Sequence, residues 1–204
     1  SEDELTGIDF KLNKGETLAI IGATGSGKTT LISLIPRFYD ATSGEVLVDG
    51  VNVKDYTFEA LYDKLGYVTQ KAVLFSGTIR DNVLFGESAD DADTARLNGA
   101  IELSQANEFV DKLPEGTKYE IAQLGRNVSG GQKQRLSIAR ALARKPEILI
   151  FDDSFSALDY RTDAKLREGL NEQLHGTTKI IVAQRISTIR HADRIIVLDR
   201  GEMI

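Results

Sequence analysis

Apolar and polar residues follow two patterns that alternate along the chain. Short continuous runs rich in Ile, Leu and Val predict buried strands, whereas longer segments with an apolar residue every three to four positions predict helices. The expected strands are 17–21, 45–48, 65–68, 148–151, 179–183 and 194–198. The expected helices are 29–35, which Pro36 ends, 129–143, and a segment marked by Leu166, Leu170 and Leu174.

The alternation of strands and helices is typical of βαβ units, so we expect an α/β fold with a mainly parallel sheet. The strand at 45–48 alternates apolar and polar residues and meets a turn at Asp49-Gly50, which predicts an antiparallel β subdomain. Phe10 lies in a segment that also resembles a strand, and we expect its ring to belong to the core.

Residues 79–112 are expected to be mostly helical. Their apolar face contains Leu97, Ile101 and Leu103, and Gly86 and Gly99 interrupt it. We therefore expect a single domain over 1–204, with a helical subdomain over about 79–143 inserted between the core strands. The chain stops soon after a turn at Gly201 without an obvious final helix, and it resembles a piece of a longer polypeptide trimmed at both ends.

Composition narrows the classes of function. A share of 41% hydrophobic and 27% charged residues argues against disorder, and 204 residues suffice for one well-packed core. The 31 acidic residues outnumber the 25 basic ones, and the pI near 5.1 disfavours a nucleic-acid partner. Cysteine is absent, which excludes disulfides, thiol catalysis and zinc–thiolate sites. No apolar run approaches the roughly 20 residues that cross a bilayer.

The segment G-A-T-G-S-G-K-T at 22–29 matches the phosphate-binding loop G-x-x-x-x-G-K-[ST] at every fixed position. It has the right neighbours, because a predicted buried strand precedes it and a predicted helix follows. Glycines let consecutive backbone N–H groups point at phosphate oxygens, and the helix N-terminus adds its positive end. Lys28 is expected to contact the β- and γ-phosphates, and the Thr29 hydroxyl is expected to ligate Mg²⁺.

The segment I-L-I-F-D-D at 148–153 is a Walker-B pattern. A buried parallel strand delivers its carboxylates to the carboxyl edge of the sheet, where open α/β folds bind ligands. We expect Asp152 to hold Mg²⁺ through water, and Asp153 to orient or polarise the attacking water.

A third motif lies between these two. Residues 127–135, N-V-S-G-G-Q-K-Q-R, resemble the signature motif of the ABC ATPases, the nucleotide-binding domains of ATP-binding cassette proteins. Other segments are similar to motifs of this family and come in the family's order. Gln70 resembles the Q-loop glutamine, S-A-L-D at 156–159 the D-loop, and I-I-V-A-Q-R at 180–185 the switch region. The segment L-F-S-G-T-I at 74–79 is similar to the exporter subgroup.

The resemblance implies the ABC ATPase fold with ATP and Mg²⁺ as cofactors. Gln70 would sense the γ-phosphate and Mg²⁺, join Thr29 and Asp152 as a metal-site residue, and face a membrane domain. The signature of one domain would close over the ATP of another in a head-to-tail dimer. The implied nucleotide-binding residues are Gly22, Thr24, Gly25, Ser26, Gly27, Lys28, Thr29, Thr30, Gln70, Ser129, Gly130, Gly131 and Gln132. The helix start at Ser129 can also bind an anion on physical grounds alone, through its N–H groups and the helix dipole.

Two positions depart from the family pattern. Asp153 stands where the family usually has glutamate, so its side chain is about 1.5 Å shorter. Gln184 stands where the family usually has histidine, and glutamine cannot be protonated. The two histidines, His175 and His191, are predicted to be solvated or capping residues and not substitutes for the missing one. Lys28, Asp153 and Gln184 are thus the expected catalytic group of a site with slow turnover.

These departures predict half of a heterodimeric exporter at the cytoplasmic face of a membrane. Its own site would hold ATP, its intact signature would complete the site of a non-identical partner domain, and transmembrane domains would be further partners. Two alternatives stay open: a regulatory ATP-binding clamp with little hydrolysis, and a homodimer in which both substitutions are tolerated. A Gly-Glu pair is also usual before the signature, where Ala122 and Gln123 stand here. The aromatic residue that stacks on adenine in the family is expected to lie before the start of the chain.

Overall fold

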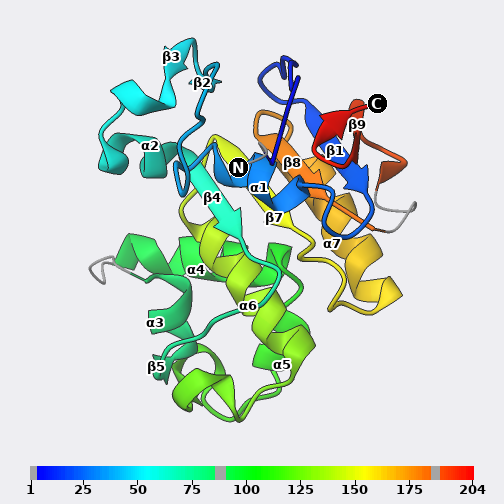
Figure 1. The fold of residues 1–204 in the computed structure, drawn as a ribbon. Coiled ribbons are helices and arrows are strands. Elements are labelled where there is room, and N and C mark those ends of the chain that lie inside the picture. Colours follow the sequence, from blue (N-terminus) through cyan, green and yellow to red (C-terminus); the bar gives the residue numbers. More distant parts are fainter. Residues whose placement is uncertain (1–3, 86–90, 185–188) are drawn as a thin grey trace. The chain divides into compact units, whose positions relative to one another are not determined.

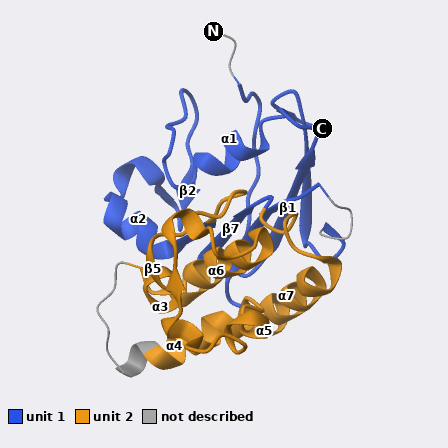
Figure 2. Ribbon diagram, turned by 90° about the horizontal axis from the view of Figure 1, so that it is seen from below, with its two compact units in different colours: residues 1–67, 147–153, 176–204 blue, residues 68–146, 154–175 orange. Residues whose placement is uncertain are grey.

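The computed structural model describes residues 4–85, 91–184 and 189–204. It divides into two compact units (Figure 2). Unit 1 comprises residues 1–67, 147–153 and 176–204, and unit 2 comprises residues 68–146 and 154–175. The chain therefore leaves unit 1 and returns to it twice. No helix among the described residues has both the length and the apolar character needed to span a bilayer.

Unit 1 is built on a mainly parallel sheet (Figure 1). Its six strands are ordered β10-β9-β1-β8-β7-β4. Strands β9, β1, β8 and β7 run parallel, and β10 pairs with β9 in the antiparallel direction. The strands are β1 (Thr17–Gly22), β4 (Leu65–Val68), β7 (Ile148–Asp152), β8 (Thr178–Val182), β9 (Arg194–Asp199) and β10 (Glu202–Met203). The sheet confirms the α/β fold expected from the sequence.

The register of the sheet brings distant parts of the chain to one edge. Val182 of β8 pairs with Ile20 of β1 on one side and with Asp152 of β7 on the other. Because these strands are parallel, their carboxyl ends meet at the same edge of the sheet. The segments that follow β1, β7 and β8 are the phosphate loop, Asp153 and Gln184, so the topology alone collects them.

The core of unit 1 forms between this sheet and helix α1 (Lys28–Ser33). Leu31 and Ile32 of α1 pack with apolar side chains from β1, β7, β8 and β9. Ile8 and Leu12 also pack on this cluster. The predicted core position of Phe10 is wrong, because its side chain is 38% exposed and lies in no strand. Ile8 and Leu12 occupy the core-facing positions of that segment instead.

The antiparallel hairpin of unit 1 is shorter than expected but lies in the predicted place. Strand β2 (Leu47–Val48) pairs with β3 (Val51–Asn52), and Asp49 and Gly50 form the turn with φ of 52° and 77°. Positive φ at both central residues is what a tight hairpin turn requires. The hairpin is followed by a 3₁₀ turn (Val53–Asp55) and by helix α2 (Phe58–Lys64). The sequence pattern did not indicate these two elements. Thr57 caps α2, since its side chain accepts a hydrogen bond from the Ala60 N–H.

Unit 2 is mostly helical. Its helices are α3 (Ile79–Val83), α4 (Asp91–Leu103), α5 (Asn107–Val110), α6 (Gly130–Ala143) and α7 (Tyr160–Gln173). Its remaining elements are β5 (Gly77–Thr78), β6 (Glu120–Ile121) and the 3₁₀ turns Gly116–Lys118 and Gln123–Gly125. Helix α6 packs against α3 and α4, and α4 also contacts α7. Gly99 lies inside α4 without ending it, whereas Gly86 lies outside the described residues.

Side chains at the helix starts explain where three of these helices begin. Ser129 and Gln132 form a capping box at α6, and Thr78 and Asp81 form another at α3. Asp159 caps α7 by accepting hydrogen bonds from the Thr162 N–H at 3.0 Å and the Thr162 hydroxyl at 2.7 Å. Such caps satisfy N–H groups that have no partner inside the helix.

Candidate nucleotide-binding site

The phosphate loop has a backbone that glycine alone can follow at its first and last glycines. A Cβ atom on Gly22 would lie 2.3 Å from the Leu198 carbonyl oxygen and 2.5 Å from Ser26 Oγ. Gly27, the N-cap of α1, has φ of 98°, which is unfavourable for any residue with a side chain. These positions therefore hold the loop close to β9 and let it turn directly into the helix. Ser26 is buried, and Gly25 has φ of 80°.

Lys28 is folded back onto this loop. Its Nζ donates hydrogen bonds of 2.8 Å to the carbonyl oxygens of Gly22 and Ala23, and it lies 3.4 Å from Ser26 Oγ. Burial lowers the pKa of Lys28, and the negative charges of Asp153 and Asp152 oppose this shift. The ammonium group is thus held inside the curl of the loop, where it can attract phosphate oxygens.

Thr29 and Asp152 form a pair of hard oxygen ligands at the same edge. The Thr29 hydroxyl donates to Asp152 Oδ1 at 3.0 Å, with Oδ2 at 3.3 Å. Oxygen donors of this kind suit Mg²⁺, which is usually held by one or two protein groups, several waters and substrate phosphates. The described part of the chain has no group of three or more His, Cys, Asp or Glu that could hold a metal ion. A hydroxyl and a single carboxylate therefore fit an ion shared with a nucleotide and not an all-protein cage.

Asp152 is largely buried from solvent. Burial raises its pKa, and the neighbouring Asp153 adds to this, while hydrogen bonds from Thr29 and Tyr67 lower it. Burial and the negative charge of Asp152 raise the pKa of Tyr67 to about 12. The phenol of Tyr67 thus remains a neutral hydrogen-bond donor beside the carboxylate. No motif in the sequence marks Tyr67 as a site residue, and only its place near the end of β4 could have suggested it.

The two residues that depart from the family pattern touch each other. Gln184 Nε2 donates a hydrogen bond of 3.2 Å to Asp153 Oδ2, across 31 positions of sequence. Asp153 is buried and has φ of 48°, a left-handed conformation that aspartate adopts more readily than most residues. Its own N–H donates to the Val182 carbonyl oxygen at 3.2 Å, which fixes the backbone to β8. The carboxylate of Asp153 therefore has one oxygen committed to a neutral amide.

A cavity of about 260 Å³ opens beside these groups. It is lined by the end of β1 and the start of the phosphate loop on one side, and by Ala183, Gln184 and Ile189 on the other. Thr24, expected to bind nucleotide, is among its lining residues.

Thr30 lies on α1, and its hydroxyl donates to Glu4 Oε1 at 2.7 Å. Arg185, the last residue of the switch motif, lies outside the described residues.

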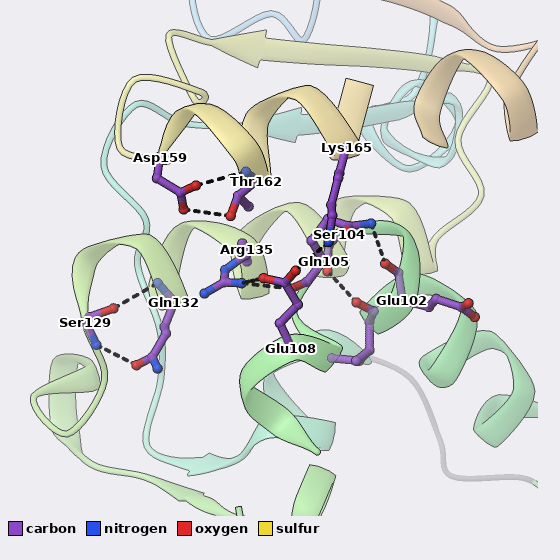
Figure 3. Close-up of polar contacts among 11 residues, drawn as sticks. Glu102, Ser104, Gln105, Glu108, Ser129, Gln132, Arg135, Asp159, Thr162 and Lys165 are labelled. Carbon is purple, nitrogen blue, oxygen red and sulfur yellow. Dashed lines mark hydrogen bonds and ion pairs between the residues drawn. The ribbon is translucent and has the colours of Figure 1, made fainter. Parts of the chain in front are cut away.

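The signature residues lie in unit 2, at the start of α6. The Ser129 N–H donates to Gln132 Oε1 at 2.8 Å, and the Gln132 N–H donates to Ser129 Oγ at 3.2 Å (Figure 3). Ser129 and Gly130 are exposed. A Cβ atom on Gly131 would lie 3.4 Å from the Ala157 carbonyl oxygen, so the signature and the D-loop segment lie near each other. The helix start is thus preformed and accessible, and its N–H groups and dipole suit an anion.

Gln70 belongs to unit 2, two positions after the end of β4, and its side chain is exposed. The preceding residue is tied to the signature helix, because Gln134 Nε2 donates to the Thr69 carbonyl oxygen at 3.2 Å. Ser154 Oγ donates to the Val68 carbonyl oxygen at 2.8 Å. Sequence analysis assigned no role to Gln134 and Ser154, although both are buried polar residues. They connect the Q-loop segment to α6 and to the segment after Asp153.

The phosphate loop, the acidic strand end and the capped signature helix together define a nucleotide-binding domain of the ATP-binding cassette type. A sequence model of the ABC transporter family matches residues 5–156, and the chain belongs to this family. It matches an ATP-bound bacterial Atm1-family ABC exporter with a TM-score of 0.92 and 37% identity, over 98% of this chain and 35% of that one. The fold is therefore the ABC ATPase fold of an exporter.

The chain is also similar to curated proteins that are named as multidrug exporters. The chain is 42% identical over 203 residues to a Bacillus subtilis (strain 168) protein whose name describes a multidrug export ATP-binding/permease protein. It is 44% identical over 201 residues to a similarly named protein of Staphylococcus aureus (strain NCTC 8325). The alignments cover 100% and 98% of this chain but only 35% and 34% of those proteins. The chain thus spans about a third of the length of the relatives it matches.

Proposed function

We propose that this chain is the ATP-binding and ATP-hydrolysing module of an ABC exporter, and that its own nucleotide site turns over slowly. It would work in a head-to-tail dimer with a second nucleotide-binding domain that is not identical to it. The observation that carries this proposal is the hydrogen bond of 3.2 Å between the Gln184 amide and the Asp153 carboxylate. The rest of the site contains the residues that bind a nucleoside triphosphate.

In the proposed site, the phosphate loop binds the phosphates of ATP through the N–H groups of 22–30. Lys28 leaves the carbonyl oxygens of Gly22 and Ala23 and contacts the β- and γ-phosphates. Thr29 and Asp152 hold Mg²⁺, which supplies charge neutralisation on the phosphates when it is bound. Thr24 and Thr30 are proposed as further nucleotide contacts, and Gln70 as the residue that senses the γ-phosphate.

Hydrolysis needs a base close to the attacking water, and here two features weaken it. The Asp153 side chain is one methylene shorter than glutamate, and a misplacement of about 1 Å can cost on the order of 100-fold in rate. One of its oxygens also accepts a hydrogen bond from Gln184. Glutamine carries no charge and cannot exchange a proton, so it holds the carboxylate without helping to move the proton.

The signature site has none of these weaknesses. Its capping box is complete, its glycines are in place, and Ser129 and Gly130 are exposed. In the proposed dimer Ser129, Gly130, Gly131 and Gln132 act on the nucleotide of the opposite domain. The chain's own ATP site is weakened, whereas the signature that it contributes to the opposite ATP site is intact. Such a chain is best paired with a non-identical domain whose own site hydrolyses ATP efficiently.

A surface of unit 2 suits a partner from the membrane. Phe75 and Phe85 are both exposed and stack on each other with ring centroids 4.8 Å apart. The Arg140 guanidinium lies 5.2 Å and 5.8 Å from the two ring centroids and donates to the Asn82 and Val73 carbonyl oxygens. Exposed aromatic surface on a rigid base is typical of interaction sites. We propose that a segment of the transmembrane domains contacts this surface, at the cytoplasmic face of the membrane.

The decisive experiment compares steady-state ATP hydrolysis by four forms of the full-length polypeptide that contains this chain. They are the wild type, D153E, Q184H and the double variant D153E/Q184H, each assembled with its second cassette. We expect the wild-type site to contribute little to total turnover and the double variant to raise the turnover of this site, and not of the whole dimer, about tenfold, since acid–base groups typically contribute on the order of 100-fold or more. Full activity of the unmodified chain when it assembles only with itself would overturn the proposal.

Single-turnover measurements with one site disabled at a time separate the proposal from a regulatory clamp. With the partner's phosphate-loop lysine replaced, a slow but measurable single turnover at this chain's site supports a hydrolysing module. If ATP stays intact there while the dimer remains closed, this chain's site is a clamp and hydrolysis belongs to the partner alone.

A further inference from the structure

A carboxylate on the short helix α5 connects two longer helices of unit 2. Glu108 Oε1 accepts a hydrogen bond of 2.9 Å from Lys165 Nζ of α7, and Oε2 lies 3.3 Å from Arg135 Nη1 of α6 (Figure 3). Each oxygen of the carboxylate therefore serves a different helix. The positive charges around Glu108, with the Lys165 hydrogen bond as the largest cause, lower its pKa, so that it stays ionised near neutral pH.

The two helices held by Glu108 are those that begin at functional N-caps. Helix α6 begins after Ser129 of the signature, and α7 begins after Asp159 of the D-loop segment. Arg135 and Lys165 each lie in the second turn of their helix, close to these starts. Glu108 thus acts on the ends of α6 and α7 that present the signature and the D-loop segment.

Arg135 is the more firmly held of the two cations. Its Nη1 also donates to the Gln105 carbonyl oxygen at 2.9 Å, and its guanidinium lies 5.0 Å from the centre of the Phe109 ring. The side chain of Arg135 is mostly buried, whereas those of Glu108 and Lys165 are partly exposed. The Gln105 carbonyl oxygen, between α4 and α5, and the Phe109 ring therefore hold Arg135 in place. Glu108 binds both Arg135 and Lys165, and so it links α6 to α7.

The signature backbone at the start of α6 lies near the D-loop segment that precedes α7. A Cβ atom added to Gly131 would reach van der Waals distance, 3.4 Å, of the Ala157 carbonyl oxygen, so a side chain of one carbon would fill the space between the two segments. A relative displacement of α6 and α7 would change this spacing and would turn the N–H groups of the signature away from their target. Positioning errors of about 1 Å can cost on the order of 100-fold in rate.

We infer that Glu108 is a positioning residue: by binding Arg135 and Lys165 it keeps the signature at Ser129 and the D-loop segment at Asp159 in the relative arrangement that the opposite nucleotide requires. This inference rests on the proposed function, because it assigns the signature to the nucleotide of the second cassette. It concerns the site that the chain lends, and it is independent of the weakened residues Asp153 and Gln184.

The test replaces the charge and keeps the shape. E108Q in the full-length polypeptide, assembled with its second cassette, should lower kcat for ATP hydrolysis by about tenfold and leave KM for ATP unchanged. Binding of a fluorescent ATP analogue by the isolated chain should also stay unchanged, since Glu108 belongs to unit 2 and the phosphate loop to unit 1. The matched control is E102Q, a change of the same kind at an exposed glutamate of α4, which should leave kcat at the wild-type value.

A double-mutant cycle separates positioning from general loss of stability. If Glu108 acts through Lys165, K165M should lower kcat, and adding it to E108Q should produce little further loss. An effect of E108Q that disappears after normalising to the amount of folded, nucleotide-binding protein would overturn the inference. An unchanged kcat for E108Q would overturn it as well.

Failure of the inference and failure of the proposed function would give different experimental results. If S129A abolishes the activity of the opposite site but E108Q has no effect, the proposed function stands and the role of Glu108 is refuted. If neither S129A nor E108Q changes hydrolysis at the opposite site, the proposed use of the signature is itself wrong.

Discussion

The two proposed anion sites of this chain differ in how their residues are engaged. At the phosphate loop in unit 1, the reactive side chains are bound to one another: Lys28 to loop carbonyls, Thr29 to Asp152, and Gln184 to Asp153. At the signature in unit 2, the capping box leaves an exposed helix start. If the proposal is correct, the first site exchanges internal hydrogen bonds for contacts with a ligand, whereas the N–H groups of the second are presented to an anion without such an exchange.

Because of this difference, we expect substitutions at the two sites to have unequal consequences. In unit 1 a change at one residue releases its partner, so effects are coupled. In unit 2 the signature depends mainly on backbone N–H groups and on how α6 is held, so effects follow the position of the helix.

Replacement of Lys28 should have the largest effect. K28A removes the charge that faces the phosphates, and ATP affinity of the isolated chain should fall by about 100-fold, because hydrogen bonds to charged groups are each worth about 1.5–3 kcal/mol. Fluorescence titration with an ATP analogue measures this directly. K11A, at an exposed lysine outside the phosphate loop, serves as the control. Affinity of K28A within twofold of the wild type would place the nucleotide elsewhere.

Replacement of Ser129 should separate binding from turnover. S129A removes an N-cap and should lower the free energy of unfolding by about 1 kcal/mol. ATP binding by the isolated chain should remain, since the phosphate loop lies in the other unit, whereas hydrolysis at the opposite site of the dimer should fall. Parallel titration and ATPase assays test this, and equal losses in both would contradict the division of labour between the units.

Replacement of Asp152 should show that its ionised carboxylate lowers the free energy of unfolding of the chain. Its pKa is raised in the folded state, mainly by burial, so the ionised carboxylate disfavours folding at neutral pH. D152N should therefore raise the free energy of unfolding by about 1 kcal/mol at pH 7 while weakening Mg²⁺-dependent ATP binding. As the pH falls into the range where carboxyls protonate, the wild type gains stability relative to D152N, and the difference shrinks. Urea unfolding at several pH values measures it, and a difference that grows on acidification would reverse the sign.

The aromatic surface of unit 2 should give the smallest effect on the chain itself. F85A removes one ring of the stacked pair, which is worth about 0.5–1.5 kcal/mol beyond its buried area. Because Phe85 is exposed, the isolated chain should remain folded and bind ATP normally. In the full-length protein F85A should reduce the stimulation of ATPase activity by a transported compound. F10A, which removes an exposed ring in unit 1, is the control.

Much of the fold could be predicted from the sequence. The predicted strands at 65–68 and 148–151 agree with β4 and β7 to within one residue, and Ser129 was correctly placed at the start of a helix. These elements have strong local signals: continuous apolar runs, or a cap followed by a helical period. Helix α2 was missed because its partly exposed apolar residues give no clear period, and Phe10 was wrongly assigned to the core.

The sequence by itself determined the chemistry that is available, because a glycine-rich loop, a lysine, a threonine and two aspartates are recognised by type and spacing. Only the tertiary structure decided which of these groups touch. It paired Gln184 with Asp153, set Tyr67 beside Asp152, and joined α6 to α7 through Glu108. The physical reason is that the sheet places β7 next to β8 and aligns their carboxyl ends, while helix packing in unit 2 closes distances that no local pattern encodes.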